Sequence, residues 1–334
     1  MANNKTTLED LARLAGVSIS TVSRALNDQP PISLKTKQRI WALARAHDYP
    51  FRHSMPTAPI GAEGSIAIVT PHVRGRPLPL SHPFFLELLA SIGEAARERG
   101  CDFTVSHVAP ANFDDLVTAT TTSRASGVIF LGQGMLHEDF NRLAGTGARF
   151  VIWGAHLPGQ NYRSIGSDNL LGGRRATLHL ARLGRRAIAF VGGSDPEAQQ
   201  RRRGYLDALA ECGIDPDPRR IVQVEFELES AEAAVERLLR LGVPFDGIVA
   251  ASDLIALGAI RALRSKGRAV PGDVSVVGYD DMLLSRLSTP ALTTIRQDTF
   301  RAGQLLVASV LEPLPDDSPG YLPTELIVRE SCGA

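Results

Sequence analysis

The residues that could do catalytic or metal chemistry do not occur at the spacings that such chemistry needs. The sequence has no phosphate-binding glycine loop, no HExxH zinc motif and no GxSxG nucleophile motif. GQG at 132–134 does not complete a dinucleotide-binding fingerprint, and VGG at 191–193 ends an apolar run, where glycine is ordinary. His137-Glu138 has no second histidine at metal-ligand spacing. We therefore expect no enzymatic activity, no metal site and no cofactor.

Lysine and arginine are concentrated at the start of the chain. The formal net charge of the 334 residues is zero, from 36 basic and 36 acidic residues. Residues 1–60 hold eight of the basic and four of the acidic residues, which leaves 28 basic and 32 acidic residues in the remainder. A basic head on a mildly acidic body predicts that the head meets a polyanion such as DNA.

This basic segment has the pattern of short helices without strand-like alternation. A first helix is expected over 8–15, after a capping Thr6 or Thr7 and before Gly16, because glycine adopts the left-handed conformation that ends a helix. Ser18 and Ser33 are placed to cap a second and a third helix. The positions expected to face a small core are Leu8, Leu11, Ala12, Ala15, Val22, Leu26, Ile40, Leu43 and Ala44. Two short helices joined at a glycine and braced by a third predict a helix-turn-helix.

Beyond residue 49 the pattern changes twice. Residues 50–64 are rich in proline, glycine and small side chains and predict a linker. From Ser65 short apolar runs alternate with amphipathic stretches, which is typical of βαβ units and parallel sheets covered on both faces. The apolar runs are 65–70, 102–108, 127–132, 149–154, 187–192, 246–252 and 274–280. They are too many for one sheet, so we expect two doubly wound parallel sheets with a ligand cleft beyond their strands' carboxyl ends.

The head resembles the DNA-binding domain of the LacI/GalR family of repressors. The matching phrases are LEDLARLAGVS, TVSRALN and ISLKTKQRI followed by Tyr49. The resemblance implies that the second helix enters the major groove, where Arg24 can contact guanine, Ser20 can donate or accept, and Ile19 can meet a thymine methyl. The residues expected at phosphates are Thr6, Thr21, Ser23, Asn27, Lys35, Thr36 and Tyr49.

The linker departs from the family pattern, in which a hinge helix forms on the DNA and a leucine wedges into the minor groove. Pro56 would stop such a helix early, because proline cannot donate a backbone hydrogen bond. Met55 or Phe51 is the candidate wedge in its place. The alternative, which we favour, is a plain flexible tether.

The body resembles the sensing domain of the same family, through HPFFLELLASIGEAARERG, RRRGYLDAL, AASDLIALGAIRAL, DVSVVGYDD and PALTTIRQD in this order. By position, Arg201 matches an effector-binding arginine, whose donors suit vicinal hydroxyls or a carboxylate. Asp280 matches an acid that accepts from ligand hydroxyls, and Phe226 an aromatic that stacks on the effector. Ser252 replaces a more usual asparagine before Asp253. The other residues expected at the cleft are Phe84, Phe85, Asp168 and Gln297.

Several of these residues also have a structural interpretation. We expect Asp253 to cap a helix rather than to contact ligand, and Asp168 to do either. Asp281 is assigned to structure. One of Phe84 and Phe85 is expected in the core.

The predicted organisation is a helix-turn-helix domain at 1–49, a linker at 50–64 and a two-lobed α/β effector-binding and dimerisation domain at 65–334. Lobe 1 is expected at about 65–166 and 294–322, and lobe 2 at about 167–293 and 323–330. Three cysteines without CxxC spacing and no apolar stretch of signal-peptide or membrane-spanning length predict reduced thiols in a cytoplasmic protein.

The predicted function is that of a transcriptional repressor of carbohydrate-metabolism genes. It would bind a palindromic double-stranded DNA operator as a homodimer, under allosteric control by a small saccharide or related metabolite, without a membrane partner. The alternative is a periplasmic-type sugar-binding protein, whose body is similar but which has no basic head. A regulator that binds DNA without any effector is a third possibility.

Overall fold

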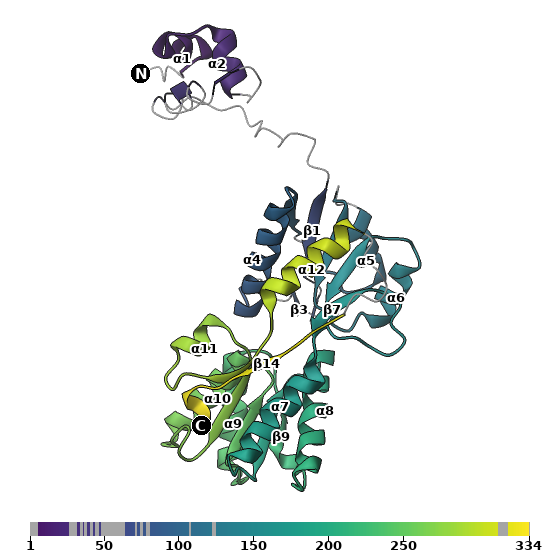
Figure 1. Ribbon diagram of the computed structural model, residues 1–334, viewed down its shortest axis with the longest axis vertical. Coiled ribbons are helices and arrows are strands. Elements are labelled where there is room, and N and C mark those ends of the chain that lie inside the picture. Colours follow the sequence, from purple (N-terminus) through teal and green to yellow (C-terminus); the bar gives the residue numbers. More distant parts are fainter. Residues whose placement is uncertain are drawn as a thin grey trace. The chain divides into compact units, whose positions relative to one another are not determined.

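The computed structural model describes residues 6–26, 32–33, 36, 39–40, 43, 47, 64–70, 72–73, 76–77, 81–106, 108–121, 125–312 and 320–333. The chain divides into two compact units, Met1–Glu63 and Gly64–Ala334 (Figure 1). Within the described residues, every helix is too short or too polar to cross a membrane.

The first unit contains the helices α1 (Leu8–Ala15) and α2 (Ile19–Leu26). Of the two predicted caps, Thr7 begins α1: its Oγ1 accepts from the Asp10 backbone N at 3.3 Å, and its own N donates to Asp10 Oδ2 at 3.0 Å. Gly16 ends α1 with φ 64°, as expected for a helix C-cap. Ser18 Oγ accepts from Thr21 N at 3.2 Å and so begins α2. The core of this unit contains Leu11, Ala12, Ala15, Val22, Ala25 and Ile40, with Leu8, Leu26 and Leu43 partly buried against it. The expected core residue Ala44 lies outside the described residues.

The second unit contains two six-stranded sheets, each belonging to one lobe. The first has the order β13-β7-β6-β5-β1-β4 and only parallel pairs. Its strands are β1 (Ser65–Val69), β4 (Asp102–Val105), β5 (Gly127–Leu131), β6 (Phe150–Trp153), β7 (Ser164–Ser167) and β13 (Tyr321–Leu322). The helices α4 (Pro83–Glu98) and α12 (Thr299–Leu311) pack together on one face, and α5 (Phe113–Thr121) and α6 (His137–Ala144) cover the other.

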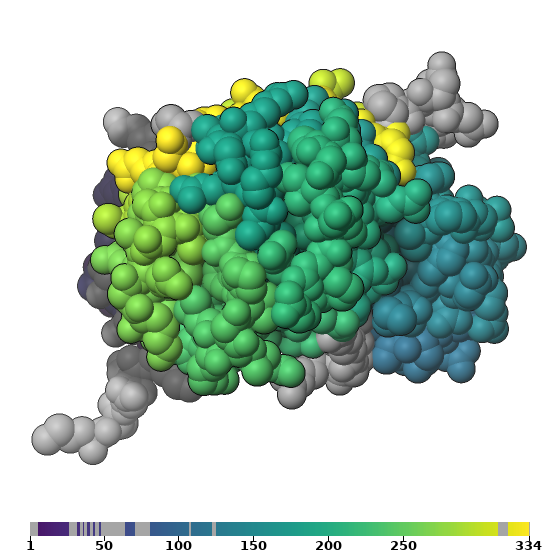
Figure 2. All heavy atoms as spheres, turned by 90° about the horizontal axis from the view of Figure 1, so that it is seen from below, coloured from purple at the N-terminus to yellow at the C-terminus, as the bar shows by residue number. Residues whose placement is uncertain are grey.

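The sheet of the second lobe has the order β14-β12-β11-β10-β8-β9, in which only the pairing of the edge strand β14 is antiparallel. Its strands are β8 (Ile188–Gly192), β9 (Ile221–Gln223), β10 (Gly247–Ala250), β11 (Ser275–Asp280), β12 (Thr293–Arg296) and β14 (Glu325–Ile327). The helices are α7 (Asn169–Arg182), α8 (Pro196–Glu211), α9 (Leu228–Arg240), α10 (Asp253–Ser265), α11 (Leu283–Leu287) and the 3-10 turns η1 (Pro218–Arg220) and η2 (Glu330–Cys332). Seen from the end of this lobe, the teal and green segments form most of the surface, with the yellow C-terminal segment along one edge (Figure 2).

One boundary of the predicted organisation is corrected. The chain crosses between the lobes after β7, after β12, and between β13 and β14. Because β12 pairs with β11 and β14, the second crossing follows Arg296 instead of preceding residue 294. After β1 the chain forms a short antiparallel pair, β2 (His72–Val73) with β3 (Arg76–Pro77).

The two lobes are joined by packing as well as by the crossings. Met282 belongs to the second lobe, yet its fully buried side chain is part of the hydrophobic core of the first lobe. The neighbouring Leu283 N donates to Glu87 Oε1 of α4 at 3.0 Å. The end of β11 is therefore fixed to the first lobe.

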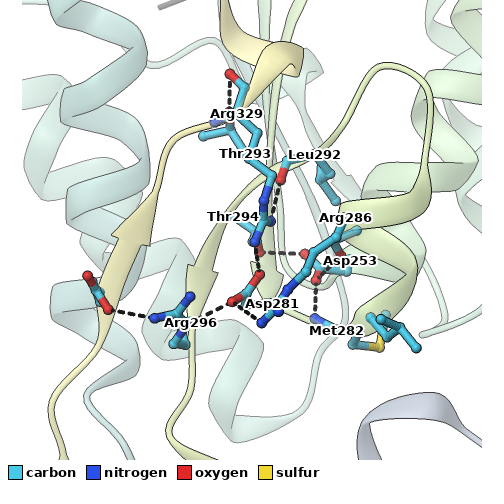
Figure 3. Close-up of polar contacts among 12 residues, drawn as sticks. Asp253, Asp281, Met282, Arg286, Leu292, Thr293, Thr294, Arg296 and Arg329 are labelled. Carbon is cyan, nitrogen blue, oxygen red and sulfur yellow. Dashed lines mark hydrogen bonds and ion pairs between the residues drawn. The ribbon is translucent and has the colours of Figure 1, made fainter.

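Asp253 does not cap α10, so this expectation is wrong. Ser252 is the N-cap, since its Oγ accepts from Ile255 N at 3.2 Å. Asp253 instead turns into the protein, where its carboxylate accepts from Thr294 Oγ1 at 2.5 Å, from Met282 N at 2.9 Å and from Ser285 Oγ (Figure 3). Burial raises the pKa of Asp253 to about 7, although these hydrogen bonds oppose the rise.

Asp281 connects three separate segments, in agreement with its expected structural role (Figure 3). Its side chain is 2% exposed, and its backbone has φ 60°, a conformation that aspartate tolerates better than most residues. Arg296 Nε lies 2.8 Å and Arg286 Nη2 3.4 Å from Oδ2, while Arg329 Nη2 binds Oδ1. The carboxylate thus joins the end of β11 to α11, β12 and the C-terminal segment.

We expect Asp281→Ala to lower the free energy of unfolding by about 3 kcal/mol, because it leaves the partly buried Arg329 without its carboxylate. Arg286 and Arg296 remain partly in water, which keeps the loss near the lower end of the range for a broken buried pair. Urea unfolding would measure it. Asp207→Ala removes an exposed ion pair with Arg203 and is the control, with an expected change within about 0.5 kcal/mol. Equal losses in both variants would contradict the prediction.

Candidate functional site

Helix α2 presents a polar surface opposite its buried face. Val22 and Ala25 are fully buried, whereas Ser20 and Arg24 are exposed and Ile19 is 46% exposed. An exposed isoleucine on a helix of eight residues is an apolar contact available to a partner. The three residues predicted to contact bases therefore lie on the surface of one helix, free to enter a groove.

Of the hydroxyl groups predicted at phosphates, Thr6 and Thr21 lie near the starts of α1 and α2, and Ser23 lies in the middle of α2. Ser18 Oγ lies 2.8 Å from both Ser20 Oγ and Thr21 Oγ1, at the N-terminus of α2. Thr6 Oγ1 donates to His47 O at 2.6 Å, which ties the start of α1 to the third helical segment. Ser23 and Thr36 are partly exposed. The candidates Asn27, Lys35, Tyr49 and Met55 lie outside the described residues. Phe51 and Pro56 also lie outside them, so the choice between a wedge and a flexible tether is not tested.

The body contains a cavity of about 420 Å³ between its two lobes. It opens at the carboxyl ends of the parallel strands, where doubly wound sheets bind ligands, and its volume suits a small molecule. From the first lobe it is lined by His82, Phe84, Phe85, Leu131, Gly132, Gln133, Gly134, Trp153, Gly154, Gly166 and Ser167. From the second lobe and the crossings it is lined by Asn169, Asp195, Glu197, Arg201, Glu225, Phe226, Glu227, Asp280 and Gln297.

Aromatic rings form apolar walls on both sides of this cavity. Phe84 packs against Phe85 and Trp153, with ring centroids 5.5 and 5.8 Å apart, and all three belong to the first lobe. Phe226 lines the cavity from the second lobe. Phe84 is buried and Phe85 half-buried, so the first has a core role as well as a place in the cavity wall.

A polar network crosses the cavity from one lobe to the other. Gln297 Nε2 donates to Asp280 Oδ1 at 2.7 Å, and Ser167 Oγ donates to Gln297 Oε1 at 2.5 Å. Arg201 Nε donates to Asn169 Oδ1 at 2.8 Å, its Nη1 donates to Ala251 O, and its guanidinium lies 3.7 Å from the centre of the Tyr279 ring. Burial raises the pKa of Asp280 well above its ordinary value, and the charge of Arg201 opposes this rise.

Two glycines allow Arg201 to reach this position. A Cβ atom on Gly173 of α7 would lie 2.1 Å from Arg201 O, and one on Gly204 of α8 would lie 1.9 Å from Leu170 O. No side chain fits at either place, so α7 and α8 contact each other through their backbones. This close contact places the start of α8 at the cavity.

Six of the eight residues predicted at the cleft line the cavity: Phe84, Phe85, Arg201, Phe226, Asp280 and Gln297. Asp168 and Ser252 are not among the lining residues. Each accepts a hydrogen bond at the start of a helix, Asp168 from Leu171 N at 2.9 Å and Ser252 from Ile255 N. Of the two roles left open for Asp168, the structure shows the helix cap.

Several residues that line the cavity were not predicted from the sequence. Gln133 and Trp153 lie at the carboxyl ends of β5 and β6, where the rule for parallel sheets could have found them. Asp195 and Glu197 begin α8 directly after β8, and the same rule applies to them. Glu225 and Glu227 flank Phe226, which itself was predicted.

The titratable groups of the cavity are strongly affected by burial. Burial raises the pKa of Glu197 to about 7, and the nearby carboxylate of Asp195 adds to the rise. Glu197 Oε1 accepts from Ala155 N of the first lobe at 3.1 Å, so this carboxyl also links the lobes. Burial lowers the pKa of His82 to about 4, which makes its imidazole neutral at pH 7.

Comparisons with known proteins agree with both units. Residues 7–50 match the family model of bacterial regulatory proteins, lacI family, and residues 177–332 match that of the periplasmic binding protein-like domain. The HTH-type transcriptional regulator CelR of Thermobifida fusca is 31% identical over 337 residues, covering 97% of this chain and 98% of CelR. The CelR–cellobiose complex superposes with TM-score 0.68 and 29% identity over 98% of this chain and 100% of that chain. The lac repressor dimer bound to operator and the anti-inducer ONPF gives TM-score 0.70 and 27% identity over 99% and 100%.

The raised pKa of Glu197 makes stability depend on pH. In the unfolded chain this carboxyl ionises near its ordinary value of 4.5, but in the folded chain near 7, so the folded state loses stability as the pH rises from about 4.5 to about 7. The raised pKa of Asp253 likewise lowers the stability of the folded state as the pH rises. We expect Glu197→Gln to raise the thermal midpoint by about 3 °C at pH 8 and to change it less at pH 5. Glu98→Gln, on the exposed end of α4, is the control. An identical shift of Glu197→Gln at both pH values would contradict the prediction.

Proposed function

Because this chain belongs to the LacI family of bacterial regulatory proteins, we propose that it binds a palindromic DNA operator as a homodimer and is controlled by a small saccharide in its inter-lobe cavity. It is a DNA-binding transcriptional regulator, and its relatives are regulators rather than enzymes. The observation that carries the proposal is the combination, in one chain, of an exposed helix α2 and a cavity lined by aromatic rings and hydrogen-bonding groups.

The chemistry of the cavity supports a saccharide. Sugar rings have apolar faces that pack on aromatic side chains, and Phe84 and Phe226 offer such faces from opposite lobes. The hydroxyl groups of a sugar can accept a hydrogen bond from the guanidinium of Arg201 and donate one to the carboxylate of Asp280. Cellobiose is the ligand named in the CelR complex. A disaccharide or monosaccharide is therefore the effector class we propose.

The coupling between effector and DNA follows from the arrangement of the lobes. A ligand that touches Phe85 and Gln133 of one lobe and Arg201 and Phe226 of the other favours the lobe orientation in which all these contacts form. The first lobe begins at β1, which follows directly after the linker to the head. In a dimer, a change of lobe orientation alters how two heads span half-sites about 34 Å apart. Effector and operator affinities are then reciprocally coupled.

Exposed apolar side chains support the homodimer. Leu86 of α4, Phe300 of α12 and Leu283, Leu284 and Leu287 of α11 are all exposed, Leu287 by 70%. α4 packs on α12, and α11 is held to α4 through Glu87, so these side chains belong to elements in mutual contact. A large exposed apolar surface of this kind marks an interaction site. A second copy of the chain is the occupant we propose for it, and the similar lac repressor structure is that of a dimer.

The test is an in vitro selection of the full-length protein against random duplex DNA at moderate salt, with and without a panel of sugars. We expect an enriched palindrome. A selected central CG step would support a wedge from the linker, and an unselected centre would support the tether. No enrichment under any condition would contradict the regulator and favour the solute-binding alternative.

Arg24→Ala tests the surface of α2 on the selected palindrome. We expect the binding free energy to weaken by about 1–3 kcal/mol, because an arginine that contacts guanine bidentately is lost. Fluorescence anisotropy at fixed salt would measure the affinity. Arg13→Ala, on the exposed face of α1, is the control and should cost less. Equal losses of DNA-binding free energy in both variants would mean that Arg24 contributes only its positive charge and does not contact a base.

Arg201→Ala tests the cavity. We expect it to abolish the effect of the effector on DNA affinity while DNA binding itself persists, since Arg201 lines the cavity and lies outside the helical unit. Arg203→Ala, an exposed position on the same helix, is the matched control. A normal effector response in Arg201→Ala would overturn the assignment of this cavity.

A further inference from the structure

The cavity has an unusual excess of acidic side chains. Among the described residues that line it, Arg201 is the only lysine or arginine. Against it stand five carboxyl groups, those of Asp195, Glu197, Glu225, Glu227 and Asp280. All five belong to the second lobe, so the negative charge lies on one side of the cavity.

The single positive charge is already engaged. Arg201 donates from Nε to Asn169 and from Nη1 to the Ala251 carbonyl, and its guanidinium lies against the Tyr279 ring. It also lies close enough to Asp280 to affect the ionisation of that carboxyl. His82, the other basic group of the cavity wall, is partly buried, and its pKa of about 4 keeps it neutral at pH 7. Even if Glu197 and Asp280 are both protonated, the carboxyl groups on the cavity wall outnumber its single guanidinium group.

An independent observation concerns hydrogen bonding on the opposite wall. Gln133 is 1% exposed, and its Nε2 donates to Ala155 O at 2.7 Å and to Tyr162 OH at 2.8 Å. Its Oε1 is buried and has no hydrogen-bond partner among the described residues. A buried acceptor without a donor is costly. The wall of the first lobe thus has a buried acceptor that needs a donor, and the two ring nitrogens of His82 on the same wall, one a donor and one an acceptor in the neutral imidazole, also have no partner among the described residues.

An ammonium group meets all these demands. It supplies three donors and no acceptor, and its positive charge is attracted by the acidic wall. Aromatic faces such as those of Phe226 and Trp153 also attract cations. A phosphate or a sugar carboxylate has the opposite character, because it only accepts and is negatively charged.

We propose that the effector is a cationic saccharide, an amino sugar, whose ammonium group is bound by Asp195 and Glu197 while its ring packs against the aromatic walls. Sugar phosphates and sugar acids are excluded by the same carboxylates. This inference rests on the proposed function of the cavity as a saccharide site, and it names the charge class of the ligand.

The carboxyls at the start of α8 are well placed for this role. Asp195 Oδ1 caps the helix by accepting from Ala198 N at 2.9 Å, and Glu197 Oε1 accepts from Ala155 N of the first lobe. Both side chains are thus held by the backbone, and Glu197 bridges the lobes. A cation bound here would stabilise the ionised form of Glu197 and reinforce its contact across the cavity.

The test is calorimetric binding to the full-length protein at pH 7 and low salt, with sugars that differ only in charge. The probes are glucose, glucosamine, glucuronate and glucose 6-phosphate, the corresponding galactose series, and cellobiose with its diaminated counterpart. We expect an aminated sugar to bind at least about tenfold tighter than its neutral parent, a difference of about 1.4 kcal/mol. The anionic sugars should not bind. A neutral or anionic sugar that binds as tightly as its aminated counterpart, or the absence of binding by every aminated sugar, would overturn the proposal.

Variants connect the preference to the carboxyls. The double variant Asp195→Asn, Glu197→Gln keeps the shapes of both side chains and should reduce the ratio of aminated to neutral affinity to about one. Glu211→Gln, near the far end of the same helix, is the control and should retain the preference. A preference retained in the double variant would also overturn the assignment. If a neutral or anionic sugar instead alters binding to the selected palindrome, the regulatory function stands and only the charge class is wrong.

Discussion

The chain passes between its two sheets three times, and this constraint determines where the functional side chains of the body can lie. Each crossing places residues at the edge where parallel strands end, so the two rows of strand ends face each other across one cavity. Ser167 lies at the first crossing and Gln297 at the second, and a hydrogen bond joins them. The polar network at the cavity is therefore built on the crossings themselves.

Three buried acidic residues near one end of β11 help to hold the chain crossings between the two sheets in place. Asp253, Asp280 and Asp281 are all buried, and each is satisfied in a different way: by hydroxyl and backbone donors, by an amide, and by three guanidinium groups. Their partners come from α11, which follows shortly after Asp281, and from β12 and the C-terminal segment, which lie farther along the chain. Uncompensated buried carboxylates are costly, so these partners fix the second and third crossings in place while Asp280 remains at the cavity.

Local patterns allowed much of the fold to be predicted, and non-local contacts account for the remainder. The cap at Thr7, the left-handed Gly16 and the alternation of apolar runs with helices depend on neighbouring residues. The family resemblance supplied Arg201, Asp280 and Phe226. The helix cap at Ser252 instead of Asp253 was not predictable, because hydrogen bonds from Thr294 and Met282 draw Asp253 inward. The membership of β12 in the second sheet and the approach of Glu197 to Ala155 likewise depend on residues far along the chain.

Met282 gives the body a pivot. Because its side chain is buried in the core of the first lobe while its backbone continues the second, rotation about this contact leaves the nearby atoms almost still. β1 spans five residues from the carboxyl edge of its sheet to Ser65, a lever arm of about 17 Å. A rotation of about 10° about the carboxyl edge therefore displaces Ser65, the first residue of β1, by about 3 Å, close to the rise of one strand residue. In the proposed mechanism, a ligand that changes the angle between the lobes would thereby move the opposite end of the first lobe.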